Sequence, residues 1–320
     1  MKIGVIGVGN IGKEIIAQAL KRRWEVVFGL NRSGVFNSKL EKIDESKNYK
    51  KYIPQCDVIF LAIPTTDDGV RAYRYINEIV GLGIPVVTCE KGALANYYHK
   101  LEKNLDRIGF NATVGGSSRI LDFAKEYRNK NIVAVHVVLN GTMNFLFNEL
   151  SQGRNPQRAV NRAVAQGYTE PQAKKLSGVL SVESEIDIPN KTSILFNHLN
   201  ATPTKVRARY FKPEALSEEQ VEKLLKEAKN WRYIVSISKN PISEEKLCGF
   251  EYHVDGWYIS AGFKNVYANK KYQELVLPGV GNKIILVDDK GNTYAHFGIG
   301  AGQEITVQTM MEEAESLAKS

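Results

Sequence analysis

Short apolar runs alternate with amphipathic stretches through the first third of the chain. The runs KIGVIGV, WEVVFGL, CDVIFLAIP and IPVVTCE are almost continuously apolar, and helical patterns over residues 11–22 and 69–83 separate them. A further helix over 93–109 and a strand over 111–116 (NATVGG) extend the pattern. Apolar strands that alternate with helices are typical of a parallel sheet buried on both faces. The sequence therefore predicts an α/β fold with a doubly wound parallel sheet over residues 1–135.

The pattern changes near residue 136. IVAVHVVLNGTMNFLFNELSQG runs from a strand into an apolar helix, and PQRAVNRAVAQG and PNKTSILFNHLN predict two more helices. Period-two strands from WRYIVSIS to KIILVDD, broken by Gly, Pro and Asn-Lys, predict an antiparallel or mixed sheet. At 320 residues the chain has room for two domains. We expect an inserted α+β domain over 136–295 and a C-terminal segment, 296–320, whose helix returns to the first domain.

Composition is that of a soluble globular protein, with 43% hydrophobic and 24% charged residues. No apolar run approaches the roughly 18 residues that span a bilayer, and the N-terminus lacks the pattern of a signal peptide. We therefore expect a cytoplasmic protein that does not enter membranes. The 3 cysteines, Cys56, Cys89 and Cys248, are widely spaced and lack neighbours at metal-ligand intervals. The sequence predicts neither a disulfide framework nor a metal site.

The formal net charge of +8 is compatible with a nucleic acid, an anionic cofactor or a lysine-rich surface. The basic residues are scattered along the chain, and no predicted element carries a stripe of arginine and aromatic side chains. We expect no nucleic-acid partner.

The segment VIGVGNIG carries a G-x-G-x-x-G arrangement directly after a strand and at the start of a helix. Gly7 permits the tight turn, Gly9 lets the backbone approach a pyrophosphate, and Gly12 lets the helix pack closely on the strand. Asn10 and Ile11 open the helix whose N-terminus faces the phosphates. At the N-terminus of a strand, turn, helix and strand unit, this motif predicts a Rossmann-type dinucleotide site.

The end of the second strand favours NADP over NAD. An acidic residue at this position binds the ribose diol of NAD, whereas a basic residue accommodates the 2′-phosphate of NADP. The chain has Asn31, Arg32 and Ser33 here and no acidic residue. A guanidinium and a hydroxyl suit a phosphate better than a diol. NAD stays open as an alternative, because Arg32 is also compatible with a solvated loop.

Lys91 follows the strand IPVVTCE, where an open α/β sheet binds ligands at its carboxyl edge. The positive end of a helix dipole disfavours a lysine at the start of a helix. Either Lys91 contacts an anionic or carbonyl ligand, or it is an ordinary exposed lysine. The sequence around it leaves both interpretations open.

Taken in order, seven segments resemble those of homoserine dehydrogenases. They are GVIGVGNIG, VVTCEKGALA, VGGSSRIL, NGTMNFL, GYTE, IDIPNKTSIL and GIGAGQEIT, and they extend from the first strand to the last helix. That family interconverts L-homoserine and L-aspartate 4-semialdehyde with NAD(P), in the biosynthesis of threonine and methionine. The resemblance implies this activity, an NADP cofactor with NAD possible, and a homodimer that assembles through the 136–295 domain, which would also bind the substrate.

The resemblance also implies roles for lysine and acidic residues. Lys91 and Lys191 would surround the reacting carbonyl, with Lys191 as the proton donor. Asp187 lies one helical turn before Lys191 and would hydrogen-bond the substrate hydroxyl or hold the lysine. Glu170 and Tyr168 would bind the substrate, with the Glu170 carboxylate pairing with the α-ammonium group. Hydride addition creates an alkoxide, which explains the need for a cationic or proton-donating group.

Small residues would line the cleft between nicotinamide and substrate. The resemblance places Gly141 and Thr142 on the substrate side. It places Gly115 and Ser117, from the run 115–118, and Gly300 next to the cofactor.

The chain departs from the family pattern at several positions. The usual T-A-N-K and G-G-G-I-P segments have Cys89, Glu90 and Arg119 in place of Ala, Asn and Pro. The segment from Glu170 to Asp187 is longer than in the family, QAKK replaces its acidic residues, and Glu185 replaces a Gly. The insert would either leave the pocket as a surface excursion or rebuild it. Asp187 before Pro189 is also compatible with a helix N-cap and no catalytic role.

We expect a homoserine dehydrogenase-like enzyme of the short form, without the regulatory domain that some relatives append. Two rivals remain. The longer Glu170 to Asp187 segment is compatible with a dehydrogenase of the same fold that acts on another amino or keto acid. A catalytically inactive NADP-binding sensor would keep the nucleotide domain and bind the cofactor without turnover.

Overall fold

The chain folds into two compact units. In the computed structural model, residues 1–169 and 173–319 are described. One unit comprises Met1–Thr113 and Gln303–Ser320, and the other comprises Val114–Gly302. The boundaries of these units lie at other residues than the boundaries of the predicted domains. The predicted domains, 1–135, 136–295 and 296–320, stay a prediction.

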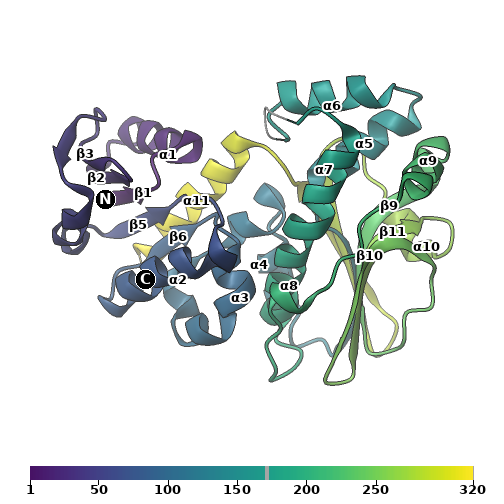
Figure 1. Ribbon diagram of the computed structural model, residues 1–320. Helices are drawn as coiled ribbons and strands as arrows, with labels where there is room; N and C mark the ends of the chain where they lie inside the picture. The colour runs from purple at the N-terminus through teal and green to yellow at the C-terminus, as the bar shows by residue number, and fades with distance from the viewer. Residues whose placement is uncertain (170–172, 320) are drawn as a thin grey trace. The chain divides into compact units, whose positions relative to one another are not determined.

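A seven-stranded sheet organises the first unit, in the order β4-β3-β2-β1-β5-β6-β7 (Figure 1). The strands are β1 (Lys2–Ile6), β2 (Glu25–Asn31), β3 (Gly34–Phe36), β4 (Lys42–Asp44), β5 (Val58–Leu61), β6 (Val86–Thr88) and β7 (Ile108–Gly109). The helices of this unit are α1 (Asn10–Lys21), α2 (Val70–Gly81), α3 (Gly92–Leu101) and α11 (Gln303–Leu317). Strands β2, β1, β5, β6 and β7 are parallel, and β3 and β4 form an antiparallel edge. The predicted doubly wound fold is confirmed.

Helix α11 completes the hydrophobic core of this unit. Met310 and Met311 are fully buried among side chains of β1, β5 and α1, such as Val5 and Ile15. A hydrogen bond from the Arg22 guanidinium to the side chain of Gln308 also joins α1 and α11, at 3.3 Å. The last helix therefore packs with elements formed by the first residues of the chain.

The strand predicted over NATVGG is wrong. Residues Asn111–Thr113 form a 3-10 turn, and β7 ends before it. Both the backbone N–H and the side-chain amide of Asn111 donate to the Glu313 carboxylate, at 2.9 and 3.0 Å, and Thr113 Oγ1 donates to the Phe110 carbonyl at 2.6 Å. These side-chain hydrogen bonds compete with a strand ladder, as short polar residues often do.

A six-stranded sheet organises the second unit, in the order β10-β11-β9-β8-β12-β13. The strands are β8 (Ile132–Val138), β9 (Trp231–Ser238), β10 (Lys246–Val254), β11 (Trp257–Asn265), β12 (Gly281–Asp288) and β13 (Thr293–Ile299). The helices are α4 (Ile120–Glu126), α5 (Gly141–Ser151), α6 (Pro156–Ala165), α7 (Leu176–Val182), α8 (Ile188–Leu199), α9 (Glu218–Lys226) and α10 (Lys270–Glu274). Every pairing is antiparallel, so the structure selects the antiparallel form of the predicted sheet.

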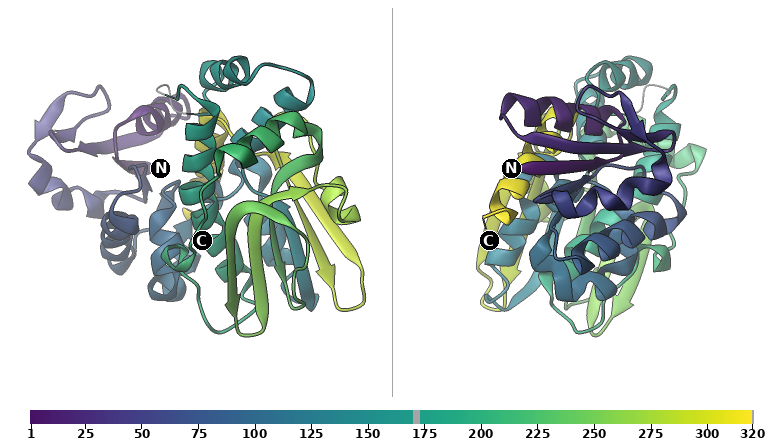
Figure 2. Two further views of the ribbon diagram at one scale, coloured as in Figure 1. Left: turned by 45° about the vertical axis from the view of Figure 1, so that its right-hand side comes forward. Right: turned by 90° about the vertical axis from the view of Figure 1, so that its left-hand side faces the viewer.

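The two faces of this sheet differ in character. Aromatic side chains join one face to the helices, through Phe147 of α5 against Phe263 and Phe196 of α8 against Trp257, with ring centroids 4.8 and 6.4 Å apart. The helices on this face are visible in the left view of Figure 2. On a strand, successive side chains point to opposite faces. This alternation sends Lys264, the neighbour of Phe263, to the other face.

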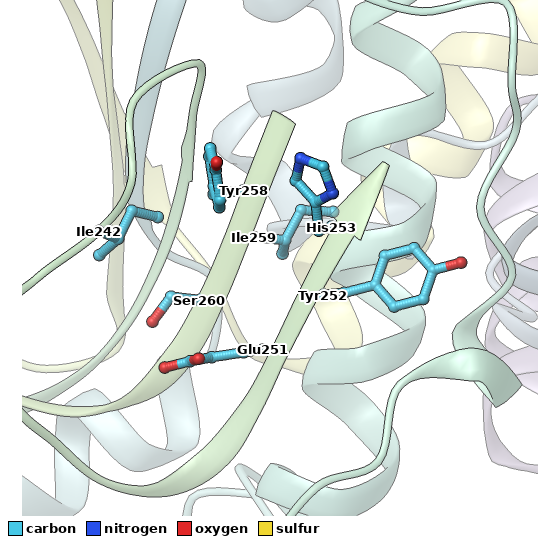
Figure 3. Close-up of a pocket in the computed structure, with 7 residues that line it drawn as sticks. All are labelled: Ile242, Glu251, Tyr252, His253, Tyr258, Ile259 and Ser260. Carbon is cyan, nitrogen blue, oxygen red and sulfur yellow. The ribbon is translucent and has the colours of Figure 1, made fainter. Parts of the chain in front are cut away.

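A hollow of about 360 Å³ lies over β10 and β11. In Figure 3, Glu251 and Ser260 project to one side of these strands, whereas Tyr252 projects to the other. Among the residues that the structure describes, none of the predicted site residues lines this hollow.

A chain of buried polar groups lies on the face opposite α5 and α8. Lys264 is 0% exposed, and its ammonium donates to the Ser260 carbonyl at 3.2 Å and to the Tyr272 hydroxyl at 3.4 Å. The Tyr272 hydroxyl contacts Ser236 Oγ at 3.0 Å, which in turn contacts Nδ1 of His136 at 3.0 Å. Burial lowers the pKa of Lys264 to about 7, with a smaller opposing effect from the Glu244 carboxylate.

We predict that Lys264 makes stability rise with pH. Because its pKa is about 7 in the fold and 10.5 in the unfolded chain, the unfolded chain binds more protons between these values. The free energy of unfolding should therefore increase across this window, by up to about 1.4 kcal/mol per pH unit from this group. Lys264→Met should abolish this component and match or exceed the wild-type stability at pH 7, because it removes a buried charge.

Denaturant unfolding at pH 7, 8 and 9 measures the effect. Lys270→Met, at an exposed position, is the matched control and should keep the wild-type dependence. An unchanged pH dependence in Lys264→Met would contradict the assignment to Lys264.

Candidate functional site

The glycine motif forms a turn between β1 and α1 that tolerates no side chain at two positions. Gly7 has φ of +101°, and a Cβ there would lie 2.3 Å from the Ala62 carbonyl oxygen. A Cβ on Gly12 would lie 2.0 Å from the Gly7 carbonyl oxygen, so the helix passes directly over the turn. At Gly9 a Cβ would meet nothing within 4 Å. Gly9 caps α1 without a side-chain hydrogen bond, and Asn10 and Ile11 begin the helix. Such a helix start offers backbone N–H groups to an anion.

A pocket of about 240 Å³ opens beside this turn. Backbone and side chains from the carboxyl ends of β1, β2 and β5 line it, including Gly7, Gly9, Asn31 and Arg32. Ser33 donates through both its N–H and its hydroxyl to Asn31 Oδ1, at 2.7 and 2.6 Å, which shapes the turn after β2. The structure thus brings the glycine motif and the predicted ribose-reading residues Asn31 and Arg32 to one pocket.

Two further residues of this pocket come from α2. Arg71 and Tyr75 line it, and the Arg71 guanidinium lies over the Tyr75 ring at 5.9 Å from its centroid. They are separated by one helical turn and therefore share a face of α2. The sequence marks α2 only as an amphipathic helix, and the missed signal is an arginine and an aromatic residue on its polar side. Arg71 adds a second guanidinium to the pocket that contains Arg32.

Glu90 explains how a lysine is tolerated at the start of α3. Lys91 is the N-cap residue of α3 and makes no side-chain cap. The Glu90 carboxylate, 2% exposed, instead accepts hydrogen bonds from the N–H groups of Gly92 and Ala93, at 2.8 and 2.9 Å, and from the Thr65 hydroxyl at 2.5 Å. A carboxylate at this position stabilises the positive end of the helix. The replacement of the family's asparagine by Glu90 is therefore a structural feature of this turn.

In the second unit, three glycine-containing segments converge around Gly300. A Cβ on Gly116 would lie 3.2 Å from the Gly300 carbonyl carbon, and one on Gly141 would lie 3.1 Å from the same atom. Ser117 Oγ donates to the Ile299 carbonyl at 3.3 Å. The predicted residues Gly115, Ser117, Gly141 and Gly300 thus belong to one closely packed region, with no room for larger side chains at its centre.

The Glu170 to Asp187 insert folds in part as helix. Helix α7 runs into a π-helical segment, Glu183–Asp187, and this continues directly into α8. The N–H of Ile188 donates to the Glu183 carbonyl, an i to i+5 hydrogen bond. Pro189 lacks an N–H for the carbonyl four residues earlier, and its ring would collide with that carbonyl in a regular α-helix. The N-cap interpretation of Asp187 is wrong, because Asp187 lies within a continuous helix and makes no cap.

Lys191 and Asp187 form an ion pair in which both side chains are largely buried. Lys191 Nζ lies 2.6 Å from Asp187 Oδ2, and the side chains are 9% and 15% exposed. The same ammonium donates to the Leu139 carbonyl at 3.0 Å, and this carbonyl also accepts a hydrogen bond from Asn282 Nδ2 at 3.3 Å. A buried lysine that retains its charge requires such partners. Asn282, which was not predicted from the sequence, donates a hydrogen bond to the same Leu139 carbonyl that accepts from Lys191.

Asn140 joins this ion pair to the N-terminus of α5. Its Oδ1 caps the helix by accepting from the Met143 N–H at 2.7 Å. Its Nδ2 donates to Asp187 Oδ2 at 2.8 Å and to Glu183 Oε2 at 2.5 Å. Asn140 and Glu183 were also not predicted from the sequence as site residues. The visible signal was a capping asparagine before Gly141 and an acidic residue four positions before Asp187.

Tyr168 reaches the same helix terminus. Its carbonyl accepts a hydrogen bond from Thr142 Oγ1 at 2.5 Å, and its ring lies edge-on to Phe145 with centroids 5.2 Å apart. The structure therefore brings Thr142 and Tyr168 to the end of α5 where Asn140 contacts Asp187. Glu170 lies outside the described residues.

Comparisons with known proteins identify the family. A family model described as homoserine dehydrogenase matches residues 120–314, which is more than half of the chain. A model described as NADP oxidoreductase, coenzyme F420-dependent, matches residues 2–68. The chain belongs to the homoserine dehydrogenase family. It is accordingly an NAD(P)-dependent oxidoreductase, as the ordered segments of its sequence predict.

Individual homoserine dehydrogenases are similar over most of their length. One from Pyrococcus horikoshii is 25% identical over 281 residues, which cover 76% of this chain and 80% of that protein. An NAD(+)-dependent homoserine dehydrogenase from Pseudomonas canavaninivorans is 24% identical, with 75% and 78% covered. A hyperthermophilic archaeal homoserine dehydrogenase, solved in complex with NADPH, superposes with a TM-score of 0.69 at 18% identity and covers 99% of this chain and 97% of its own. The predicted fold is thus shared with a solved member of the family.

No helix in residues 1–169 and 173–319 combines the length and apolar character needed to cross a membrane. Across the same residues, no group of three or more His, Cys, Asp or Glu side chains is arranged to hold a metal ion.

We predict that Glu90 contributes to stability through α3. Glu90→Gln keeps the size of the side chain but presents an NH₂ group to one of the hydrogen-bond donors, so the variant loses charge-assisted hydrogen bonds in a buried place. The free energy of unfolding should fall by about 1.5 to 3 kcal/mol. Chemical denaturation followed by circular dichroism measures this loss. Glu102→Gln, near the other end of α3, is the control and should stay close to wild type, whereas equal effects of the two substitutions would refute the capping role.

Proposed function

We propose that this protein interconverts L-homoserine and L-aspartate 4-semialdehyde with NADP(H). The observation that carries the proposal is the buried Lys191–Asp187 pair beside the capped N-terminus of α5, in a member of the homoserine dehydrogenase family. Reduction of an aldehyde requires a proton donor for the developing alkoxide. Lys191 supplies an ammonium group that the Leu139 carbonyl and Asp187 hold in one orientation.

Each proposed residue has a chemical role in this reaction. NADPH, when bound, supplies the hydride that adds to C4 of the semialdehyde. Lys191 donates a proton to the resulting alkoxide oxygen, and in the reverse direction it accepts the hydroxyl proton of homoserine. Asp187 fixes the lysine and offers an acceptor to the substrate hydroxyl. Lys91 contributes a second cation for the carbonyl oxygen, and Glu170 pairs with the α-ammonium group.

The pocket beside the glycine motif fits the adenosine phosphate of NADP. The N-terminus of α1 offers N–H groups for the pyrophosphate, and Arg32 and Arg71 offer two guanidinium groups for the 2′-phosphate. A relative that uses NAD(+) keeps NAD as the alternative cofactor. Gly115, Ser117 and Gly300 are proposed to contact the nicotinamide end.

We also propose a homodimer in the cytoplasm, as expected from the sequence. Light scattering on the purified protein tests the assembly. A mass that corresponds to one chain would exclude the dimer.

We predict that Lys191→Arg lowers kcat for aldehyde reduction by about 100-fold or more. Arginine retains the positive charge beside Asp187, but it does not release a proton at any accessible pH. NADPH oxidation at 340 nm with L-aspartate 4-semialdehyde measures turnover. NADPH affinity, from fluorescence titration, should stay unchanged and serves as the control for folding.

Two outcomes would contradict the proposal. Near-wild-type kcat in Lys191→Arg would remove Lys191 as the proton donor. A wild-type protein that binds NADPH without turning over the semialdehyde would instead favour the cofactor-binding sensor, or a dehydrogenase for another amino or keto acid.

We predict that Arg71→Ala raises KM for NADPH about tenfold or more and leaves KM for NADH nearly unchanged. The guanidinium interacts with a phosphate that only NADPH carries. Arg74→Ala, on the same helix and also exposed, is the matched control. Equal changes for the two cofactors would assign Arg71 a role other than phosphate recognition.

A further inference from the structure

We propose that a pocket at the carboxyl end of α8 binds a small phosphate monoester. The pocket has a volume of about 200 Å³ and belongs entirely to the second unit. Arg128 and Lys239 line it, and no acidic side chain of the described residues does. It shares no lining residue with the pocket beside the glycine motif. The inference therefore goes beyond the proposed function and does not depend on it.

Arg128 is held at the end of α8 with part of its guanidinium left for a ligand. Its Nε donates to the His198 carbonyl at 2.7 Å, and its Nη2 donates to the same oxygen. Free carbonyls at the carboxyl end of a helix repel anions, and these two hydrogen bonds offset that effect at His198. A guanidinium carries five N–H groups in a fixed fork. The edge formed by Nη1 and Nη2 can thus bind two oxygens of one anion.

Lys239 and Asn200 add two further donors to the pocket. The ammonium of Lys239 lies over the Trp257 ring, 5.5 Å from its centroid, and forms no ion pair with any described residue. Asn200 Oδ1 accepts a hydrogen bond from Lys205 Nζ at 2.6 Å. This contact assigns the oxygen of the amide, so Asn200 Nδ2 is the atom that can donate to a ligand.

The electrostatic environment next to the pocket is also positive. Burial lowers the pKa of His198 to about 3, and the positive charges of Arg128 and Lys125 lower it as well. Asp289 approaches through its backbone, since its N–H donates to the Asn131 carbonyl at 3.2 Å, but its side chain does not line the pocket. An anion in the pocket would therefore meet two cations that lack a carboxylate partner among the lining residues.

A phosphate monoester fits these donors better than a carboxylate does. Its dianion has three terminal oxygens, which match the guanidinium edge, the ammonium and the Asn200 amide. A carboxylate carries one charge and two oxygens, and would leave one donor without an acceptor. Ile132 and Leu199 give the pocket apolar walls for a short carbon chain. Its volume lies below the roughly 300 to 1,000 Å³ of sites for drug-sized ligands, so the bound molecule is small.

The experiment is a calorimetric titration with n-propyl phosphate and with inorganic phosphate, at constant ionic strength. Lys239→Met removes the ammonium and keeps an apolar chain against Trp257. Lys270→Met, at an exposed position outside the pocket, controls for the loss of one positive charge. Arg71→Ala tests the pocket beside the glycine motif, which is the other place where a phosphate group would bind.

We expect n-propyl phosphate to bind saturably to the wild type, with inorganic phosphate binding more weakly because it lacks the carbon chain. Lys239→Met should raise Kd for n-propyl phosphate about tenfold, the usual effect of losing a hydrogen bond to a charged group. Lys270→Met and Arg71→Ala should match the wild type. The melting temperature of Lys239→Met without ligand should stay unchanged, which shows that the loss concerns binding.

A purely structural role for these side chains would produce a different result. If Arg128 only capped α8 and Lys239 only packed on Trp257, the wild type would bind neither probe at millimolar concentration, and the proposal would be overturned. An unchanged Kd in Lys239→Met together with a loss in Arg71→Ala would assign the phosphate to the pocket beside the glycine motif and overturn it as well. Equal affinity for the two probes would overturn the organic part of the ligand.

Discussion

Holding a charged lysine side chain inside the second unit constrains much of that unit. Lys191 needs an acceptor and a counter-charge away from water, and it finds them in the Leu139 carbonyl and in Asp187. Asn282 fixes that carbonyl from β12, and Asn140 fixes the carboxylate from the start of α5. The contacts of one ammonium group and its partners therefore connect the ends of two strands and two helices. Small changes in any of these elements would alter its orientation.

Close packing around Gly300 supports the same arrangement. A Cβ on Gly300 would lie 2.3 Å from the side chain of Asn282, so a larger residue would displace the amide that holds Leu139. Gly141, which begins α5, approaches Gly300 from another side. Chemistry and packing are thus coupled, because the glycines that keep this region compact also keep the partners of Lys191 in place.

Much of the fold was predictable because it depends on strong periodic signals. The parallel strands of the first unit are continuous apolar runs, and the period-two strands after Trp231 form the antiparallel sheet. The errors and omissions arise where a side chain of distant sequence decides the local structure. The Glu313 carboxylate accepts a hydrogen bond from the N–H of Asn111, 202 residues away, and this bond competes with strand formation in NATVGG. No local pattern reveals such a partner.

The candidate site was predictable to a similar extent. Ordered motifs indicated Lys191, Asp187 and the glycine turn, but the neighbours that hold them were not visible. The sequence alone did not explain why a lysine, Lys91, stands at the start of a helix. The stabilising effect of Glu90 depends on hydrogen bonds from the first N–H groups of α3 to its carboxylate, which the sequence does not reveal. Arg71 lines the pocket beside the glycine motif only through the packing of α2. Residues that act through tertiary contacts require the structure.

The π-helical segment between α7 and α8 also affects where the sequence can change in length. Each residue of an α-helix turns the chain by roughly 100°. The wide turn at Glu183–Asp187 takes up one extra residue, so deletion of one residue there would restore an α-helical turn and leave α7 and α8 in nearly the same rotation about the helix axis. A deletion within α7 has no wide turn to absorb it and would rotate part of the buried set Leu176, Val179 and Leu180. A change in length by one residue is accordingly easier to accommodate in the π-helical segment than within α7.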